Sequence, residues 1–129
     1  MYTANAYSTY KNNSVNYASK EQLLLMLLDG AVKFAKIGRQ AIQEKNIPKA
    51  HENIVKTQKI FYELMMTLDL EKAENWGARL MSLYDFIVRR LIDANIKKDI
   101  KIMDEVIPFI EQVKDMWQEA YKVSKGIKK

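Results

Sequence analysis

Few side chains in this sequence could form a catalytic or metal site. Its 129 residues include no Cys and a single His, His51, so Cys–His catalysis is excluded and a Ser-His-Asp triad would depend on that one imidazole. A di-iron bundle needs Glu-x-x-His pairs on facing helices, and the sequence has no such pair. We therefore expect no catalytic residues, no bound metal and no cofactor, and a protein that is not an enzyme.

The glycines and the basic residues indicate no ligand either. Gly30, Gly38 and Gly77 stand singly within expected helices, so they do not form a phosphate-binding loop. The net charge is +5, but acidic residues lie among the basic ones, for example beside Arg89 and Arg90, and no continuous basic stripe results. We expect no nucleic-acid partner, and a small basic bundle that contacts phosphates remains the alternative.

The helix that would position the rest begins at a clear capping signal. Ser19 can accept hydrogen bonds from the first turn, and Gln22 is placed to complete a capping box. The spacing predicts a helix from Lys20 to about Glu44. Its apolar run over residues 23–28 goes more than once around the helix, so part of it must face something besides one core.

Three more helices follow at similar spacing. Asn46 can cap the second, with Pro48 in its first turn; a connection at about 69–75 precedes the third; and Asp99 can cap the fourth, in which Pro108 should bend the axis. The predicted buried seams of these helices are Ile47, Ala50, Ile54, Thr57, Phe61, Leu64 and Leu68; Trp76, Leu80, Leu83, Ile87, Leu91 and Ala94; and Met103, Val106, Ile110, Val113, Trp117 and Ala120.

Four long amphipathic helices with short connections predict an all-α fold, an antiparallel up-down four-helix bundle. Residues 1–18 carry four Tyr, one Lys and no helical periodicity, and we expect them to form a flexible N-terminal arm. The predicted division is therefore an arm at 1–18, the bundle at 19–125 and a basic tail at 126–129. No run of apolar residues is long enough to span a membrane, so we expect no stable membrane insertion.

Apolar residues beyond the seams suggest a surface for a partner, because a client helix would occupy such lines. Methionines suit this role, since they repack around varied side chains. Gln58 lies beside its seam, and its amide should bond a neighbouring helix or, less in keeping with the pattern, a visiting backbone. The candidate residues are Leu25, Val32, Val55, Gln58, Tyr62, Met66, Met81, Tyr84, Val88, Ile92, Asn95, Phe109 and Met116, with Tyr7, Tyr10 and Val15 in the arm.

A set of short stretches spread along the chain matches one known family in order and spacing. They are Tyr7-Ser-Thr-Tyr10, Asn13-Ser-Val-Asn16, Ala18 to Gly30, Asn53 to Gln58, Glu63-Leu64, Thr67-Leu68, Leu83-Tyr-Asp-Phe86, Arg89-Arg-Leu91, Ala94-Asn95 and Trp117. Together they resemble the flagellin export chaperone family, FliS. The family usually has Pro in place of Lys20 and Tyr in place of Leu28.

The resemblance implies a cytoplasmic helical bundle that binds the disordered C-terminal segment of flagellin. Such a chaperone prevents premature polymerisation and presents flagellin to the membrane export gate of the type III apparatus, so the implied partners are flagellin and an export gate protein. The chaperone itself would be a monomer or a weak homodimer. An alternative interpretation of the apolar lines is that they pack in a homodimeric interaction module.

Overall fold

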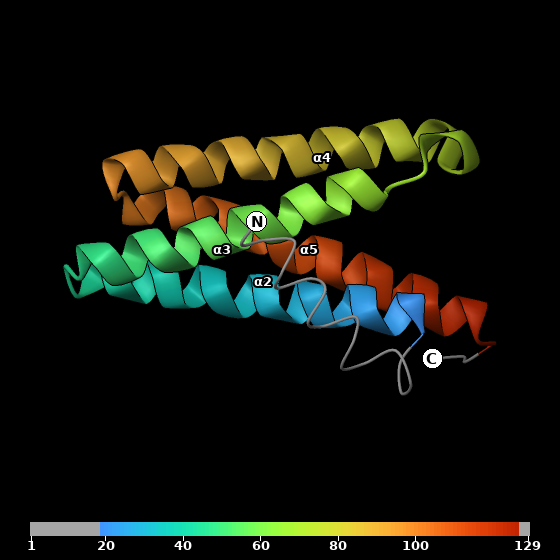
Figure 1. The fold of residues 1–129 in the computed structure, drawn as a ribbon, viewed down its shortest axis with the longest axis horizontal. Coiled ribbons are helices and arrows are strands. Elements are labelled where there is room, and N and C mark those ends of the chain that lie inside the picture. Colours follow the sequence, from blue (N-terminus) through green and yellow to red (C-terminus); the bar gives the residue numbers. More distant parts are fainter. Residues whose placement is uncertain (1–18, 127–129) are drawn as a thin grey trace.

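Four long helices run side by side in alternating directions (Figure 1). They are α2 (Lys20–Gln43), α3 (Ile47–Thr67), α4 (Leu70–Lys97) and α5 (Ile100–Ser124). This computed structural model describes residues 19–126, except for the side chains of 70–74. The predicted all-α bundle is confirmed for the described part of the chain.

The three predicted helix starts are confirmed by their caps. Ser19 Oγ accepts from the Gln22 backbone N–H at 3.2 Å, and Gln22 Oε1 accepts from the Ser19 N–H at 2.9 Å, which completes the capping box. Asn46 Oδ1 accepts from the Lys49 N–H at 3.3 Å at the start of α3. Asp99 caps α5 in the same way, so local side chains decide where these helices begin.

The turn from α2 into α3 has a lysine in a left-handed conformation. Lys45 has φ 60°, its N–H bonds the Ile42 carbonyl, and the next N–H, that of Asn46, bonds the Ala41 carbonyl. This is a Schellman motif, in which glycine is the preferred residue because a Cβ costs free energy at positive φ. The turn therefore carries some backbone strain.

Replacing Lys45 with glycine should relieve that strain. We expect Lys45→Gly to raise the free energy of unfolding by about 0.5 to 1 kcal/mol, measured by urea denaturation. Lys33→Gly, at an exposed position inside α2, is the control and should lose about 1 kcal/mol. A loss of stability in Lys45→Gly would show that the lysine side chain contributes more than its backbone costs.

The start of α4 differs from the prediction. The connection expected at 69–75 is wrong, because α4 begins at Leu70 and only Leu68 and Asp69 separate it from α3. The stretch 71–74 contains Glu, Lys and Ala, which favour a helix, and no Gly or Pro that would end one. Helix propensity therefore extends α4 ahead of its first buried residue.

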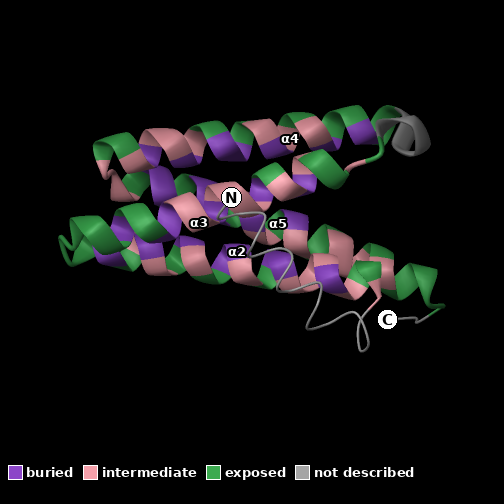
Figure 2. Ribbon diagram, in the orientation of Figure 1, coloured by how far each residue is buried: buried purple, intermediate pink, exposed green. Residues whose placement is uncertain are grey.

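The core lies along the axis between the four helices (Figure 2). Both α2 and α4 pack against α3 and α5, so α2 and α4 occupy opposite corners of the bundle. Pro108 lies inside α5 as expected. Three residues of the predicted seams, Ile47, Trp76 and Ala120, are exposed instead, because they stand near the ends of their helices where little of the bundle remains to cover them.

An aromatic group links α4 and α5 near the end of the bundle that holds the start of α4. Trp117 is partly buried, and its Nε1–H donates to the Tyr84 hydroxyl at 2.9 Å. Trp76 packs edge-to-face on Trp117, with 6.2 Å between the ring centroids. Tyr84 also meets the Phe61 ring of α3 at 5.7 Å, so this group connects three helices.

Ion pairs follow both sides of α5. Toward α2 they are Asp29–Lys114, Lys36–Glu111 and Arg39–Asp104, and the Arg39 hydrogen bond lowers the pKa of Asp104 below its ordinary value. Toward α4, Arg90 bonds Glu105 as well as Asp93 of its own helix.

Candidate partner-binding site

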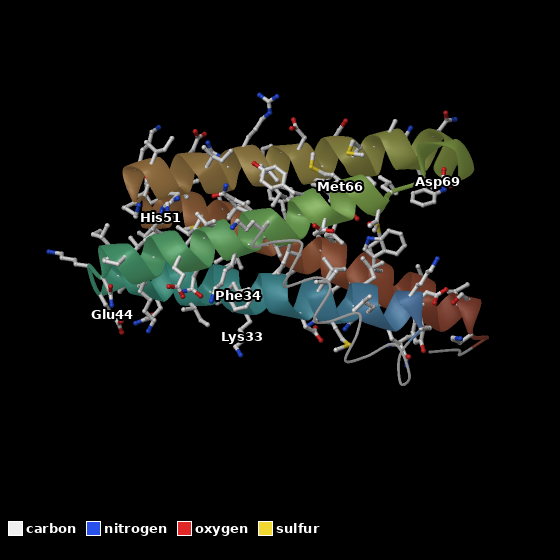
Figure 3. All side chains as sticks on the ribbon, viewed as in Figure 1. Lys33, Phe34, Glu44, His51, Met66 and Asp69 are labelled. Carbon is white, nitrogen blue, oxygen red and sulfur yellow. The ribbon has the colours of Figure 1, made fainter. Side chains whose placement is uncertain are left out.

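The structure brings most of the candidate residues together between α3 and α4. The Asn95 Nδ2 and His51 Nδ1 atoms lie 3.0 Å apart at one end, and the Phe61–Tyr84 ring contact lies further along. These two contacts fix the register of the antiparallel pair, which places Gln58 opposite Val88. Figure 3 shows His51 and Met66 on the side of α3 that faces α4.

From His51, steps of four, three, four and four residues along α3 reach Val55, Gln58, Tyr62 and Met66, so these residues share the side that faces α4. On α4 the corresponding residues are Asn95, Ile92 and Met81. We call these seven residues, Val55, Gln58, Tyr62, Met66, Met81, Ile92 and Asn95, the α3–α4 face. Tyr62 and Met66 are exposed and the other five are partly buried.

A shallow hollow marks one end of the α3–α4 face. It is lined by Pro48, His51, Glu52, Val55 and Lys56 of α3. At the same end, Lys98 Nζ donates to the Asn95 side-chain oxygen at 2.9 Å. The Asn95 amide is thus held between an imidazole and an ammonium group, which fixes the orientation of its two ends.

Three candidates turn out to be core residues. Tyr84 is 1% exposed and Val88 is 4% exposed, so their expected place on the surface is wrong, and Val32 of α2 is buried as well. The reason is that the buried arc of α4 is wider than a single stripe and includes both lines of apolar residues. Burial raises the pKa of Tyr84 to about 12, against a smaller lowering by the Trp117 hydrogen bond.

The remaining candidates lie on other sides of the bundle. Leu25 is four residues from Asp29, which pairs with Lys114, so it belongs to the α2–α5 side together with Val32. Phe109 packs edge-to-face on Phe86 at 5.1 Å, which places it on the α4–α5 side. Met116, seven residues further along α5, follows Phe109. The structure therefore does not bring these four candidates to the α3–α4 face.

The candidates Tyr7, Tyr10 and Val15 lie outside the described residues. Within them, the sequence interpretation missed Phe86 and Ile96, which are both exposed apolar residues of α4. The sequence does indicate that Phe86 is exposed, since it stands beside Arg89 and away from the buried line of its helix. Nothing in the sequence distinguishes the exposed Ile96 from the buried apolar residues nearby.

Gln58 has a different environment from the one expected. Its Oε1 atom is buried and receives no hydrogen bond from any described residue, so the preferred expectation of a bond to a neighbouring helix is wrong. Two buried polar neighbours on α3 are satisfied by their own helix: Asn53 donates to the Lys49 carbonyl and Thr57 to the Asn53 carbonyl. The Gln58 side-chain oxygen is thus a buried acceptor on the α3–α4 face that no described residue satisfies.

Neither metal binding nor membrane spanning is indicated in the part of the chain that the structure describes. It contains no group of three or more His, Cys, Asp or Glu residues that could hold a metal ion. None of its helices is both long enough and apolar enough to cross a membrane.

Comparison with known proteins gives consistent matches over nearly the whole chain. Residues 3–124 match the family model described as flagellar protein FliS. The chain is 38% identical to a flagellar secretion chaperone FliS of Bacillus subtilis, over 93% of this chain and 89% of the relative. It is 31% identical to that of Salmonella typhimurium, over 92% of each chain.

The fold also has a solved counterpart. A bacterial flagellar chaperone crystal structure superposes with a TM-score of 0.73 at 16% identity, over 92% of this chain and 97% of that one. At this identity the likeness bears on the fold alone.

Proposed function

Since the chain belongs to the FliS family and is a flagellar export chaperone, we propose that it binds the disordered C-terminal segment of flagellin in the cytoplasm. Binding would prevent premature polymerisation and present flagellin to the export gate. A disordered client gains affinity by burying apolar side chains as it becomes ordered.

The observation that carries this proposal is the α3–α4 face. Its exposed side chains include Tyr62 and Met66, of the aromatic and flexible types that adapt to a partner. The alternative function, binding of nucleic-acid phosphates, lacks similar support. Arg89 pairs with Asp85, and Arg90 pairs with Asp93 and Glu105. Apolar burial is thus the interaction that this surface offers best.

A charge within the client site should abolish much of the binding. We expect Met66→Asp to weaken binding of a flagellin C-terminal peptide at least tenfold, because its carboxylate would have to lose water against an apolar client. Isothermal titration calorimetry measures this. The matched control is Val123→Asp: Met66 is 77% exposed and Val123 is 67% exposed, but Val123 lies on α5, outside the α3–α4 face.

The control should bind within twofold of the unmodified protein. Equal binding by both variants would place the site on another face of the bundle. A lack of binding by the unmodified protein itself would refute the flagellin segment as the client.

A further inference from the structure

Gln58 is a partly buried residue of α3 whose side-chain oxygen makes no hydrogen bond within the described bundle. Its Oε1 is buried without a partner, and leaving a buried acceptor unsatisfied costs free energy. Asn53 and Thr57 show that α3 can satisfy buried polar groups with its own carbonyls. A glutamine oxygen cannot use that route, because it accepts and does not donate.

No described neighbour of Gln58 donates a hydrogen bond to its Oε1 in the observed arrangement. The residue opposite on α4 is Val88, which is buried and apolar. Along α3, one turn before and after, stand Val55 and Tyr62 of the same face. The Asn95 amide, further toward the end, is occupied by His51 and Lys98. The acceptor of Gln58 is therefore available to a donor from outside the described bundle.

We propose that the amide of Gln58, a residue that is only partly buried, turns toward the client on binding, so that Oε1 accepts a hydrogen bond from a backbone N–H of a client residue outside any helix. The inference rests on the proposed function, since it assumes that the client covers the α3–α4 face. An N–H inside a helix is already bonded to its own helix and is not free. An extended or irregular stretch of client has free N–H groups, and burying one against the protein requires an acceptor such as Gln58 Oε1.

This role predicts opposite effects on folding and on binding. Gln58→Met keeps a similar length but removes the unsatisfied acceptor, so the free chaperone should unfold at a higher urea concentration than the unmodified protein. The same variant should bind the flagellin C-terminal peptide about tenfold more weakly, because the client N–H then loses its acceptor. Gln112→Met, on an exposed part of α5, is the control and should change neither quantity.

A second measurement identifies the donor. Amide-to-ester substitution at successive peptide positions removes one backbone N–H at a time while keeping the chain shape. We expect one position at which the ester weakens binding to the unmodified protein about tenfold and leaves binding to Gln58→Met unchanged.

The possible failures are distinguishable. If the unmodified protein and Gln112→Met bind the peptide but Gln58→Met binds equally well, the role of Gln58 is refuted and the proposed function stands. Coupling at no ester position would refute the backbone donor. If the unmodified protein does not bind the peptide, the proposed function fails and this inference fails with it.

Discussion

Phe61→Ala should lower the free energy of unfolding by about 3 to 5 kcal/mol. Phe61 is 0% exposed and lies at the centre of the core, where its ring meets that of Tyr84 at 5.7 Å. Truncation removes the burial of the ring and leaves a cavity that the surrounding helices can fill only in part. Urea denaturation followed by circular dichroism gives the value.

A second phenylalanine serves as the control. Phe86 is 37% exposed and also makes an edge-to-face contact, with Phe109. Phe86→Ala therefore removes the same side-chain atoms from a more solvent-exposed site. We expect it to lose less than half as much stability as Phe61→Ala. Equal losses would mean that the α4–α5 edge is as well packed as the centre of the bundle.

The second large effect should appear at high pH. Burial raises the pKa of Tyr84 to about 12 from an ordinary value of 10.0, so the folded state favours the neutral phenol. The stability that this preference contributes is fully present below pH 10 and is lost as the pH rises toward 12. Two pKa units correspond to about 3 kcal/mol.

The comparison with Tyr84→Phe isolates this contribution. At pH 7 the variant should be less stable by about 1 to 2 kcal/mol, because the partly buried Trp117 N–H loses its acceptor. Between pH 10 and 12 the unmodified protein should lose stability more steeply than the variant, so the difference between them shrinks or reverses. Parallel decreases in the two proteins would show that folding does not raise the pKa of Tyr84.

The parts of the fold that depend on local chemistry were predictable. Ser19, Asn46 and Asp99 begin their helices as expected, since a cap and its N–H partners lie within three residues of one another. The start of α4 was not predictable in this way, because the pattern of buried residues does not indicate a helical turn that lies before the core. Propensity alone decides it.

The candidate site was only partly predictable. Helical spacing identifies Val55 and Tyr62 as one line, but it cannot give the register that sets this line beside α4. Tyr84 and Val88 were expected on the surface for a different reason: the width of the buried arc of a helix depends on how many helices surround it, which its own sequence does not give. The unsatisfied state of Gln58 depends on the residue opposite it, which only the packed structure reveals.

The aromatic group near the start of α4 also makes the protein its own optical probe. Its two tryptophans, Trp76 and Trp117, lie in one edge-to-face pair, with one ring partly buried and the other exposed. Intrinsic tryptophan fluorescence therefore comes from a single place where α4 meets α5, whereas circular dichroism averages over all the helices. A separation of these two helix ends changes the emission before the helical signal falls, so the two spectra together distinguish local opening from global unfolding.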